Sequence, residues 1–192
     1  MATPMHLATL LATLPPADRT APAVPDLASA LCAEVPRLRR LVHRLLGWRA
    51  SAHELDDVVQ DVLLKAWRHQ ATFRGDAALA TWLTRIAIHA ARDHARTARL
   101  RRVLFGWWRT DATEPAATDD GDGGADAPLD RTRAALRQLA AADREVLVLR
   151  YLEQRDIADI AQLLALSRAA VDARLSRARA RLRARLGLEA QP

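Results

Sequence analysis

Cysteine, lysine and aromatic residues are scarce in this chain of 192 residues. Its single cysteine, Cys32, excludes an intramolecular disulfide and a zinc site built from cysteines. We expect Cys32 to be a small buried residue of a helix. Aromatic residues make up 4% of the chain, and Ala, Leu and Arg are abundant, which favours helices over strands. This composition argues against a β-sandwich, a collagen-like chain and a fully disordered chain.

Long apolar segments are also missing, since no run approaches the roughly 18–20 residues of a membrane span. The first 25 residues lack a cationic leader and show no regular periodicity. They contain five prolines, at Pro4, Pro15, Pro16, Pro22 and Pro25. We therefore interpret residues 1–25 as a mobile extension and not as a signal peptide. A cytoplasmic protein without direct membrane insertion is expected.

Charge is abundant but divided unevenly along the chain. Lys and Arg total 29 and Asp and Glu total 23, giving +6, and Lys65 is the lone lysine. Residues 26–109 hold 15 cations and 8 acids, residues 110–130 hold seven acids and no cation, and residues 131–192 hold 13 cations and 7 acids. Two basic blocks indicate two contacts with a polyanion. Solvated arginine faces on ordinary helices are the alternative.

The acidic spacer predicts two domains. Its sequence TDATEPAATDDGDGGADAP, residues 110–128, has the composition of a flexible, self-repelling linker. We predict an all-α protein of two small helical domains, spanning 26–98 and 131–187, joined by a linker at 99–130 and followed by a tail at 188–192. Trp107 and Trp108 precede the acidic spacer, and we expect them to pack on a neighbouring domain or a partner.

The first block predicts a helical bundle. One helix runs from Asp26, as its cap, to about Gly47, with Pro36 as a kink or break. A second helix begins near Ser51. Its apolar positions follow helical spacing, at Leu55, Val58, Val59, Val62, Leu63, Ala66 and Trp67. The opposite side is acidic; because no histidine or nucleophile stands at fixed spacing beside it, it indicates a solvated or docking face and not a catalytic one.

A third helix is predicted from Ala80 or Thr81. Its polar face combines three arginines and a histidine at i, i+4, i+7 and i+11, namely Arg85, His89, Arg92 and Arg96. Such a face is suited to tracking phosphates. The preceding apolar loop, which includes Leu79, is expected to wall a small pocket suited to an unstacked base.

The last block predicts a helix-turn-helix. Asp143 is expected to cap a helix that ends near Leu152, Asp156 a short helix, and Ser167 a longer arginine-rich helix to about Leu186. The order of short helix, tight turn and longer helix is typical of DNA-binding proteins, in which the second helix enters the major groove.

These segments carry a family resemblance. The first block contains DDVVQDV (56–62), KAWR (65–68), FRGD (73–76), TWL (81–83) and RIA (85–87). The last contains REVLVLRYL (144–152), IADIA (157–161) and RLSRAR (174–179). They resemble regions 2 and 4 of sigma-70-family factors, and two such regions joined only by a linker resemble the extracytoplasmic-function (ECF) group.

The resemblance implies three binding surfaces. Core RNA polymerase would bind Asp56, Asp57, Gln60, Asp61 and Trp67. The promoter −10 element would be recognised and melted by Phe73, Leu79, Trp82, Arg85, His89, Arg92 and Arg96. The −35 element would be read by Ser167, Arg168, Asp172, Ala173, Arg174, Ser176 and Arg177.

The family likeness also implies that the protein is not an enzyme. It would need no catalytic residue, cofactor, metal or small-molecule substrate. Its partners would be core RNA polymerase, promoter DNA and an anti-sigma factor. The acidic linker would thread through the polymerase cleft towards the RNA exit channel.

The chain departs from the family pattern at several positions. His89 stands where Asn is usual, and Thr84 replaces a frequent Tyr. Ala165 replaces the Gly common in the helix-turn-helix turn, so we expect an adjusted turn. Asp172 replaces a basic residue and would accept a hydrogen bond from cytosine N4.

Two other functions compete with promoter recognition. A stand-alone helix-turn-helix regulator would bind operator DNA by itself, but it needs neither the TWL–RIA segment nor an acidic spacer. The second is a helical interaction module whose arginines only solvate it. A flat response to salt in a duplex-DNA binding assay would favour this module over both DNA-binding functions.

Overall fold

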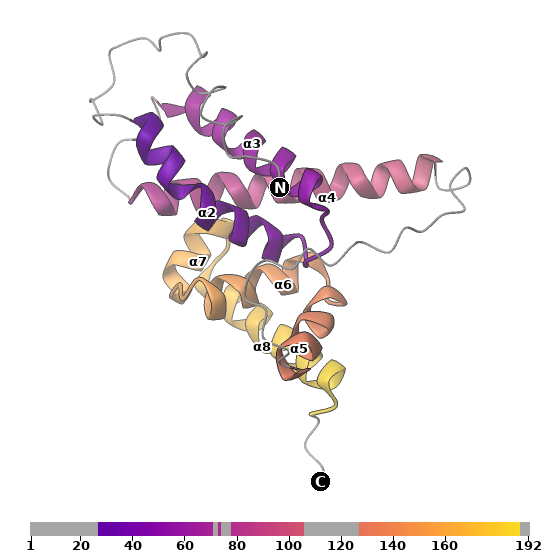
Figure 1. The fold of residues 1–192 in the computed structure, drawn as a ribbon. Coiled ribbons are helices and arrows are strands. Elements are labelled where there is room, and N and C mark those ends of the chain that lie inside the picture. Colours follow the sequence, from indigo (N-terminus) through magenta and orange to yellow (C-terminus); the bar gives the residue numbers. More distant parts are fainter. Residues whose placement is uncertain (1–26, 71–72, 74–77, 106–126, 189–192) are drawn as a thin grey trace.

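The computed structural model describes residues 27–70, 73, 78–105 and 127–188, and every regular element in these ranges is helical. The helices form two bundles that stack on one another (Figure 1). The predicted all-α fold of two small helical domains is confirmed. The predicted N-terminal extension, Asp26, residues 106–126 of the predicted linker with Trp107 and Trp108, and the last four residues lie outside the described residues. The two ends of the predicted linker, 99–105 and 127–130, are helical.

The first bundle consists of α2 (Leu27–Leu45), α3 (Ala52–Arg68) and α4 (Leu79–Phe105), which contact one another in all three pairs. The stripe predicted on α3 is buried from Leu55 to Ala66, and Trp67 at its end is half-buried. Cys32 is exposed, contrary to expectation. At about 100° per residue it falls away from the buried stripe of α2, which is formed by Leu31, Leu38, Leu41, Val42 and Leu45.

Local chemistry sets the ends of α2 and α3. Helix α2 continues through Pro36 without a break. Gly47 follows its end with φ 74°, and the Trp48 N–H donates to the His43 carbonyl at 2.9 Å. This closure requires the left-handed conformation that glycine adopts without steric cost. Ser51 then caps α3: its hydroxyl accepts from the Glu54 N–H at 3.2 Å, and its own N–H donates to the Glu54 carboxylate at 2.9 Å.

Helix α4 begins at Leu79, which was expected in a loop, and extends past the predicted boundary at residue 98. Its N-terminal half buries Leu83, Ala87 and Ala90 in the bundle. Its C-terminal end projects beyond the rest of the molecule (Figure 1). The side chains of Leu100 and Val103 are exposed there.

The second bundle contains α5 (Ala127–Arg137), α6 (Ala141–Leu147), the π-helical segment η2 (Val148–Leu152), α7 (Ile157–Leu164) and α8 (Arg168–Leu186). The prediction that Asp143 caps a helix is wrong, because the N-cap of α6 is Ala140. Asp143 instead lies buried in the first turn, where its carboxylate pairs with Arg181 of α8. A hydrogen-bonded charge partner makes that burial possible.

The helix-turn-helix formed by α7 and α8 has the predicted caps. The Asp156 carboxylate accepts from the Asp159 N–H at 2.7 Å, and the Ser167 hydroxyl accepts from the Ala170 N–H at 3.1 Å. Ala165 ends α7 in the left-handed conformation, with φ 54° and ψ 48°. The turn therefore keeps the geometry that favours glycine although the residue is alanine.

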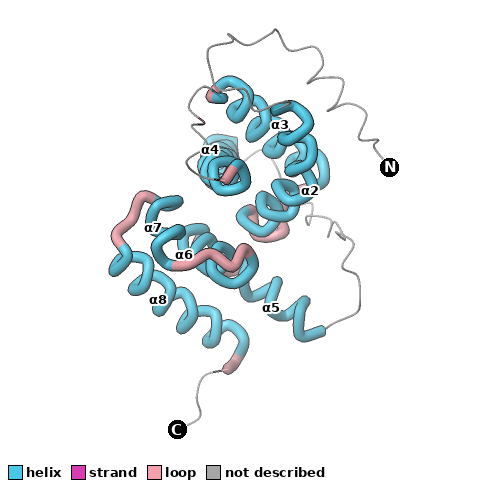
Figure 2. The backbone as a smooth tube through the Cα atoms, turned by 90° about the vertical axis from the view of Figure 1, so that its left-hand side faces the viewer, coloured by secondary structure: helices cyan, strands magenta, loops and turns pink. Residues whose placement is uncertain are grey.

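The two bundles pack into one structure. Figure 2 shows α6 and α7 lying beneath α2 and α4, and α2 contacts α6 while α4 contacts α7. The buried apolar side chains of both bundles form one contiguous cluster. This arrangement brings the predicted −10 helix against the second bundle.

Candidate nucleic-acid interface

The predicted −10 residues gather along α4 and the segment before it. Phe73 and Trp82 pack ring to ring, with centroids 5.3 Å apart and a tilt of 44°. Leu79 packs against the core from the first position of α4. The small residues expected to wall a base pocket lie partly outside the described residues, because positions 74–77 are among those left out.

The cationic face of α4 is only partly open. Arg85, His89 and Arg96 are exposed, and Arg96 forms an ion pair with Asp93 at 2.5 Å. Arg92 is instead half-buried against the second bundle. Its Nε and Nη2 donate to the two carboxylate oxygens of Glu145 in α6, at 2.8 and 2.7 Å. This hydrogen bonding raises the pKa of Arg92.

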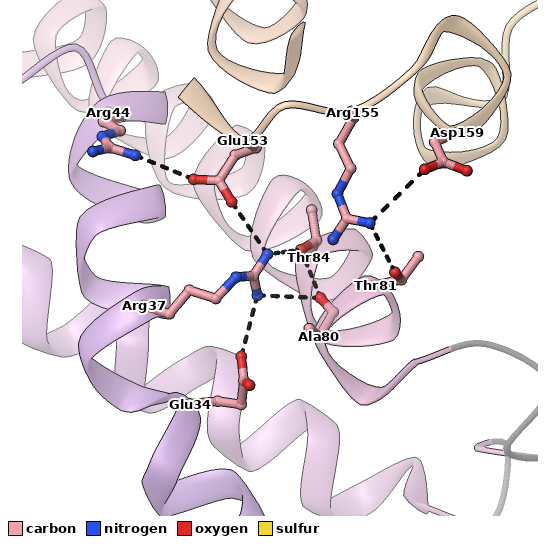
Figure 3. Close-up of polar contacts among 9 residues, drawn as sticks. All are labelled: Glu34, Arg37, Arg44, Ala80, Thr81, Thr84, Glu153, Arg155 and Asp159. Atoms are coloured by element: carbon pink, nitrogen blue, oxygen red, sulfur yellow. Dashed lines mark hydrogen bonds and ion pairs between the residues drawn. The ribbon is translucent and has the colours of Figure 1, made fainter. Parts of the chain in front are cut away.

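A second carboxylate also joins the two bundles. Glu153, directly after η2, accepts from Arg37 at 3.2 Å and from Arg44 at 3.3 Å (Figure 3). Its side chain is only 9% exposed. Arg37 also donates to the Thr84 hydroxyl at 2.8 Å and to the Ala80 carbonyl at 3.2 Å. Thr84, noted above as a departure from the family, is therefore a buried part of this interface.

Two arginines of the second bundle complete the contact. Arg155 donates to the hydroxyl of Thr81 in the first turn of α4, at 3.1 Å (Figure 3). Arg144 is buried and donates to the Leu45 carbonyl at the end of α2, at 3.0 Å. Burial lowers the pKa of Arg144. A Cβ on Gly47 would lie 3.0 Å from the Arg144 guanidinium carbon, so this glycine also permits a close approach.

Sequence reasoning assigned no role to Arg37, Glu145, Glu153 or Arg155. Glu145 directly precedes the apolar run at 146–149 and is only 4% exposed, which is unusual for a carboxylate. Its position beside that run was the available signal. It could not identify Arg92 as the partner, since the two residues are separated by the linker.

The predicted −35 residues lie together on the first three turns of α8. Ser167, Arg168, Asp172, Ala173, Ser176 and Arg177 are exposed, and Arg174 is half-buried. Their inner neighbours Val171 and Leu175 are buried in the second bundle. The helix therefore presents its polar side outward, as the recognition helix of a helix-turn-helix must.

The predicted polymerase residues line the outer side of α3. Asp57 is exposed, whereas Asp56, Gln60, Asp61 and Trp67 are half-buried. The acids already have internal partners: Asp56 pairs with Arg39, Asp57 with His53 at 3.8 Å, and Asp61 with Lys65 at 2.8 Å. The hydrogen bond that Lys65 donates to Asp61 raises the pKa of Lys65. Within the described part of the chain, no three His, Cys, Asp or Glu side chains cluster as metal ligands would.

Comparison with protein families identifies both bundles. Residues 33–101 match the model of Sigma-70 region 2, and residues 129–182 match that of Sigma-70, region 4. The chain belongs to the sigma-70 family. The two matched regions correspond to the first and second bundles, and are called region 2 and region 4 from here on.

Individual relatives agree with this sigma-70 membership. The RNA polymerase sigma factor CnrH of Cupriavidus metallidurans is 34% identical over 145 residues, covering 72% of this chain and 76% of CnrH. The ECF RNA polymerase sigma factor SigM of Mycobacterium tuberculosis is 33% identical over 158 residues, covering 79% of this chain and 74% of SigM. The chain is an ECF sigma factor of this family.

Solved structures of sigma factors share the fold. The sigma factor RpoE of Bartonella quintana, in complex with the anti-sigma factor NepR, matches with TM-score 0.67 and 27% identity, covering 87% of this chain and all of RpoE. CnrH in complex with the cytosolic domain of CnrY matches with TM-score 0.58 and 26% identity, covering 96% and 97%.

Family membership establishes the general function. As a sigma factor, the chain binds core RNA polymerase and directs it to promoters, recognising −35 and −10 elements and melting the −10 region. The stand-alone operator-binding regulator is not favoured, because region 2 is present beside the helix-turn-helix. No helix in the described ranges has both the length and the apolar character to cross a bilayer.

Proposed function

We propose that the cationic face of α4 contacts the −10 element, through Arg85, His89, Arg92 and Arg96. The observation that carries this assignment is the alignment of these four side chains on one helix whose opposite side is buried. Arginines spaced along one helix face match the repeat of phosphates along a strand. Arg92 becomes available for this contact when region 4 moves away.

The Phe73–Trp82 pair stands beside this cationic face and supplies the melting step. Aromatic rings stack on unpaired bases without regard to sequence, at about 1–3 kcal/mol per base. Leu79, like Trp82, is partly buried and packs against the hydrophobic core. We assign these three side chains to holding a non-template base after the duplex opens.

Region 4 reads the −35 element through the N-terminal turns of α8. The exposed positions from Ser167 to Arg177 fit the major groove, with arginines for guanine edges or phosphates and Asp172 for a cytosine amino group. The acidic face of α3, with Asp56, Asp57, Gln60, Asp61 and Trp67, docks on a basic surface of core polymerase.

The remaining assignments concern partners and location. RpoE and CnrH were solved with the proteins NepR and CnrY. We infer that this chain too is held by an anti-sigma factor until a signal releases it. It acts in the cytoplasm, performs no bond chemistry and takes no cofactor, and binding free energy alone opens the duplex.

Run-off transcription tests the proposed function. Core polymerase with this protein is expected to initiate from a subset of genomic promoter fragments, and no product from any fragment would overturn the assignment. Trp82→Ala and Arg85→Ala are then compared with Arg68→Ala, which removes an exposed arginine from the end of α3. Permanganate reactivity reports strand opening, and gel shift reports closed-complex binding. The first two variants are expected to reduce opening at least tenfold; equal losses of both steps would contradict a melting role.

A further inference from the structure

Region 4 places two carboxylates on three arginines of region 2. Glu145 accepts hydrogen bonds from Nε and Nη2 of Arg92 at 2.8 and 2.7 Å. Glu153 accepts one from Arg37 at 3.2 Å and one from Arg44 at 3.3 Å. The carboxylates are nearly buried, with side-chain exposures of 5% and 9%. The arginines keep 24–36% of their side-chain surface exposed.

The three arginines occupy the side of region 2 that faces region 4. Arg37 and Arg44 lie two turns apart on α2, and the guanidinium of Arg37 reaches α4 through the Thr84 hydroxyl at 2.8 Å. Arg92 lies further along the same helix α4. A guanidinium that donates to a carboxylate, with two bonds at Arg92 and one each at Arg37 and Arg44, presents the same donors to a phosphate. The surface that Glu145 and Glu153 cover is therefore a set of anion sites.

We propose that Glu145 and Glu153 act as phosphate mimics that hold the free chain closed over a nucleic-acid phosphate site formed by Arg37, Arg44 and Arg92. This inference rests on the proposed function for Arg92 and extends it to two arginines of α2. Nucleic-acid phosphates displace the two carboxylates, and the closed and DNA-bound states exclude each other.

The closed state cannot read a whole promoter. By their names the −35 and −10 elements lie about 25 base pairs apart, which is about 85 Å along B-DNA at 3.4 Å per pair. Here Arg155 of region 4 is hydrogen-bonded to Thr81 at the start of α4, 3.1 Å away. The two regions must therefore separate before both elements are bound.

The chemistry of the contact allows such a separation. An ion pair with one partly exposed member loses much of its Coulomb energy to desolvation, so it fixes an arrangement more than it stabilises it. On opening, both carboxylates and all three arginines regain water or new partners. A polyanion that offers several phosphates at once then competes effectively for the arginines.

A distance measurement on the full-length chain tests whether Glu145 and Glu153 hold regions 2 and 4 together. The exposed Cys32 on α2 is the chain's single cysteine, and Ala180→Cys adds a second label site on the exposed side of α8. Pulsed electron–electron double resonance between spin labels at these sites is expected to give a single population of short distances at low salt. Glu145→Gln and Glu153→Gln are each expected to move a large fraction of molecules to longer distances. Asp130→Asn, which removes one exposed carboxylate from α5, is the matched control and should keep the short distance.

A charge-swapped variant protects this test against misfolding. Arg92→Glu combined with Glu145→Arg is expected to restore the short population lost in Glu145→Gln, at unchanged helical circular dichroism. A short population retained in both Glu→Gln variants would overturn the proposal.

Binding of a fluorescent 12-nucleotide single strand of mixed sequence gives the second readout. The Glu145→Gln/Glu153→Gln double variant is expected to bind several-fold more tightly than the parent chain, with a steeper salt dependence of about 0.7 per added phosphate contact. Adding Arg37→Ala and Arg44→Ala should remove that gain. Opening without tighter binding would refute the phosphate mimicry. The distances are measured without promoter or polymerase. A result against the closed state held by Glu145 and Glu153 is therefore distinguishable from failure of the transcription test above.

Discussion

Arg92 of α4 and Glu145 of α6 are joined by two parallel hydrogen bonds, of 2.8 and 2.7 Å, although 52 residues separate them in the chain. The carboxylate is nearly buried and the guanidinium about one-third exposed. The bond thus fixes how regions 2 and 4 sit together, at a residue that the family resemblance assigns to promoter binding.

The coupling between these two side chains is measurable. A double-mutant cycle of Arg92→Ala and Glu145→Ala, followed by urea unfolding, is expected to give an interaction free energy of about 1 kcal/mol. The value is set low because the exposed side of Arg92 is screened by water. High salt should reduce it, and additive single effects would show that the pair contributes no net stability.

Gly47 combines a positive φ with a close approach. Gly47→Ala is expected to lower the free energy of unfolding by about 2 kcal/mol, because φ is 74° and the new Cβ would lie 3.0 Å from the Arg144 guanidinium. Gly187→Ala is the matched control. It has φ 67° but no heavy atom within 4 Å, so it reports the backbone cost alone, at about 1 kcal/mol. Equal losses of unfolding free energy in the two variants would mean that the Arg144 side chain moves aside without a free-energy penalty.

Ala165 lies in a conformation that favours glycine. Ala165→Gly is expected to raise the free energy of unfolding by up to about 1 kcal/mol, because φ is 54° at the end of α7. Ala180→Gly, at an exposed position within α8, should lower it by a similar amount. Thermal unfolding of both variants checks the opposite signs. A loss of stability in Ala165→Gly would contradict strain in the turn.

Glu54 makes stability depend on acidity. The hydrogen bond from the Ser51 N–H holds the pKa of Glu54 below its ordinary value. A lowered folded-state pKa adds stability above the unfolded-state pKa, and that stability is lost as pH falls through the folded-state value. The difference in unfolding free energy between the parent chain and Glu54→Gln should therefore shrink as pH falls below about 4.3. Urea titrations at pH 3 and pH 6 measure this difference. An unchanged difference between the two pH values would show that Glu54 does not contribute to the pH dependence of stability.

Much of the fold was readable from local patterns. The apolar stripe of α3, the start of α3 near Ser51 and the caps Asp156 and Ser167 depend on residues within one or two turns, so spacing alone identifies them. The role given to Asp143 failed because the carboxylate is held by Arg181, a residue of another helix. Cys32 was misplaced because small apolar character does not say which face of a helix is buried.

The candidate binding surfaces divide in the same way. Helical periodicity is local, so the positions of Arg85, His89, Arg92 and Arg96 in the chain suffice to place them on one face of a helix. That Arg92 is covered while its neighbours remain exposed depends on how the two bundles pack. The contact between Arg92 and Glu145 forms through the packing of whole bundles. The spacing of residues within either segment therefore does not encode it.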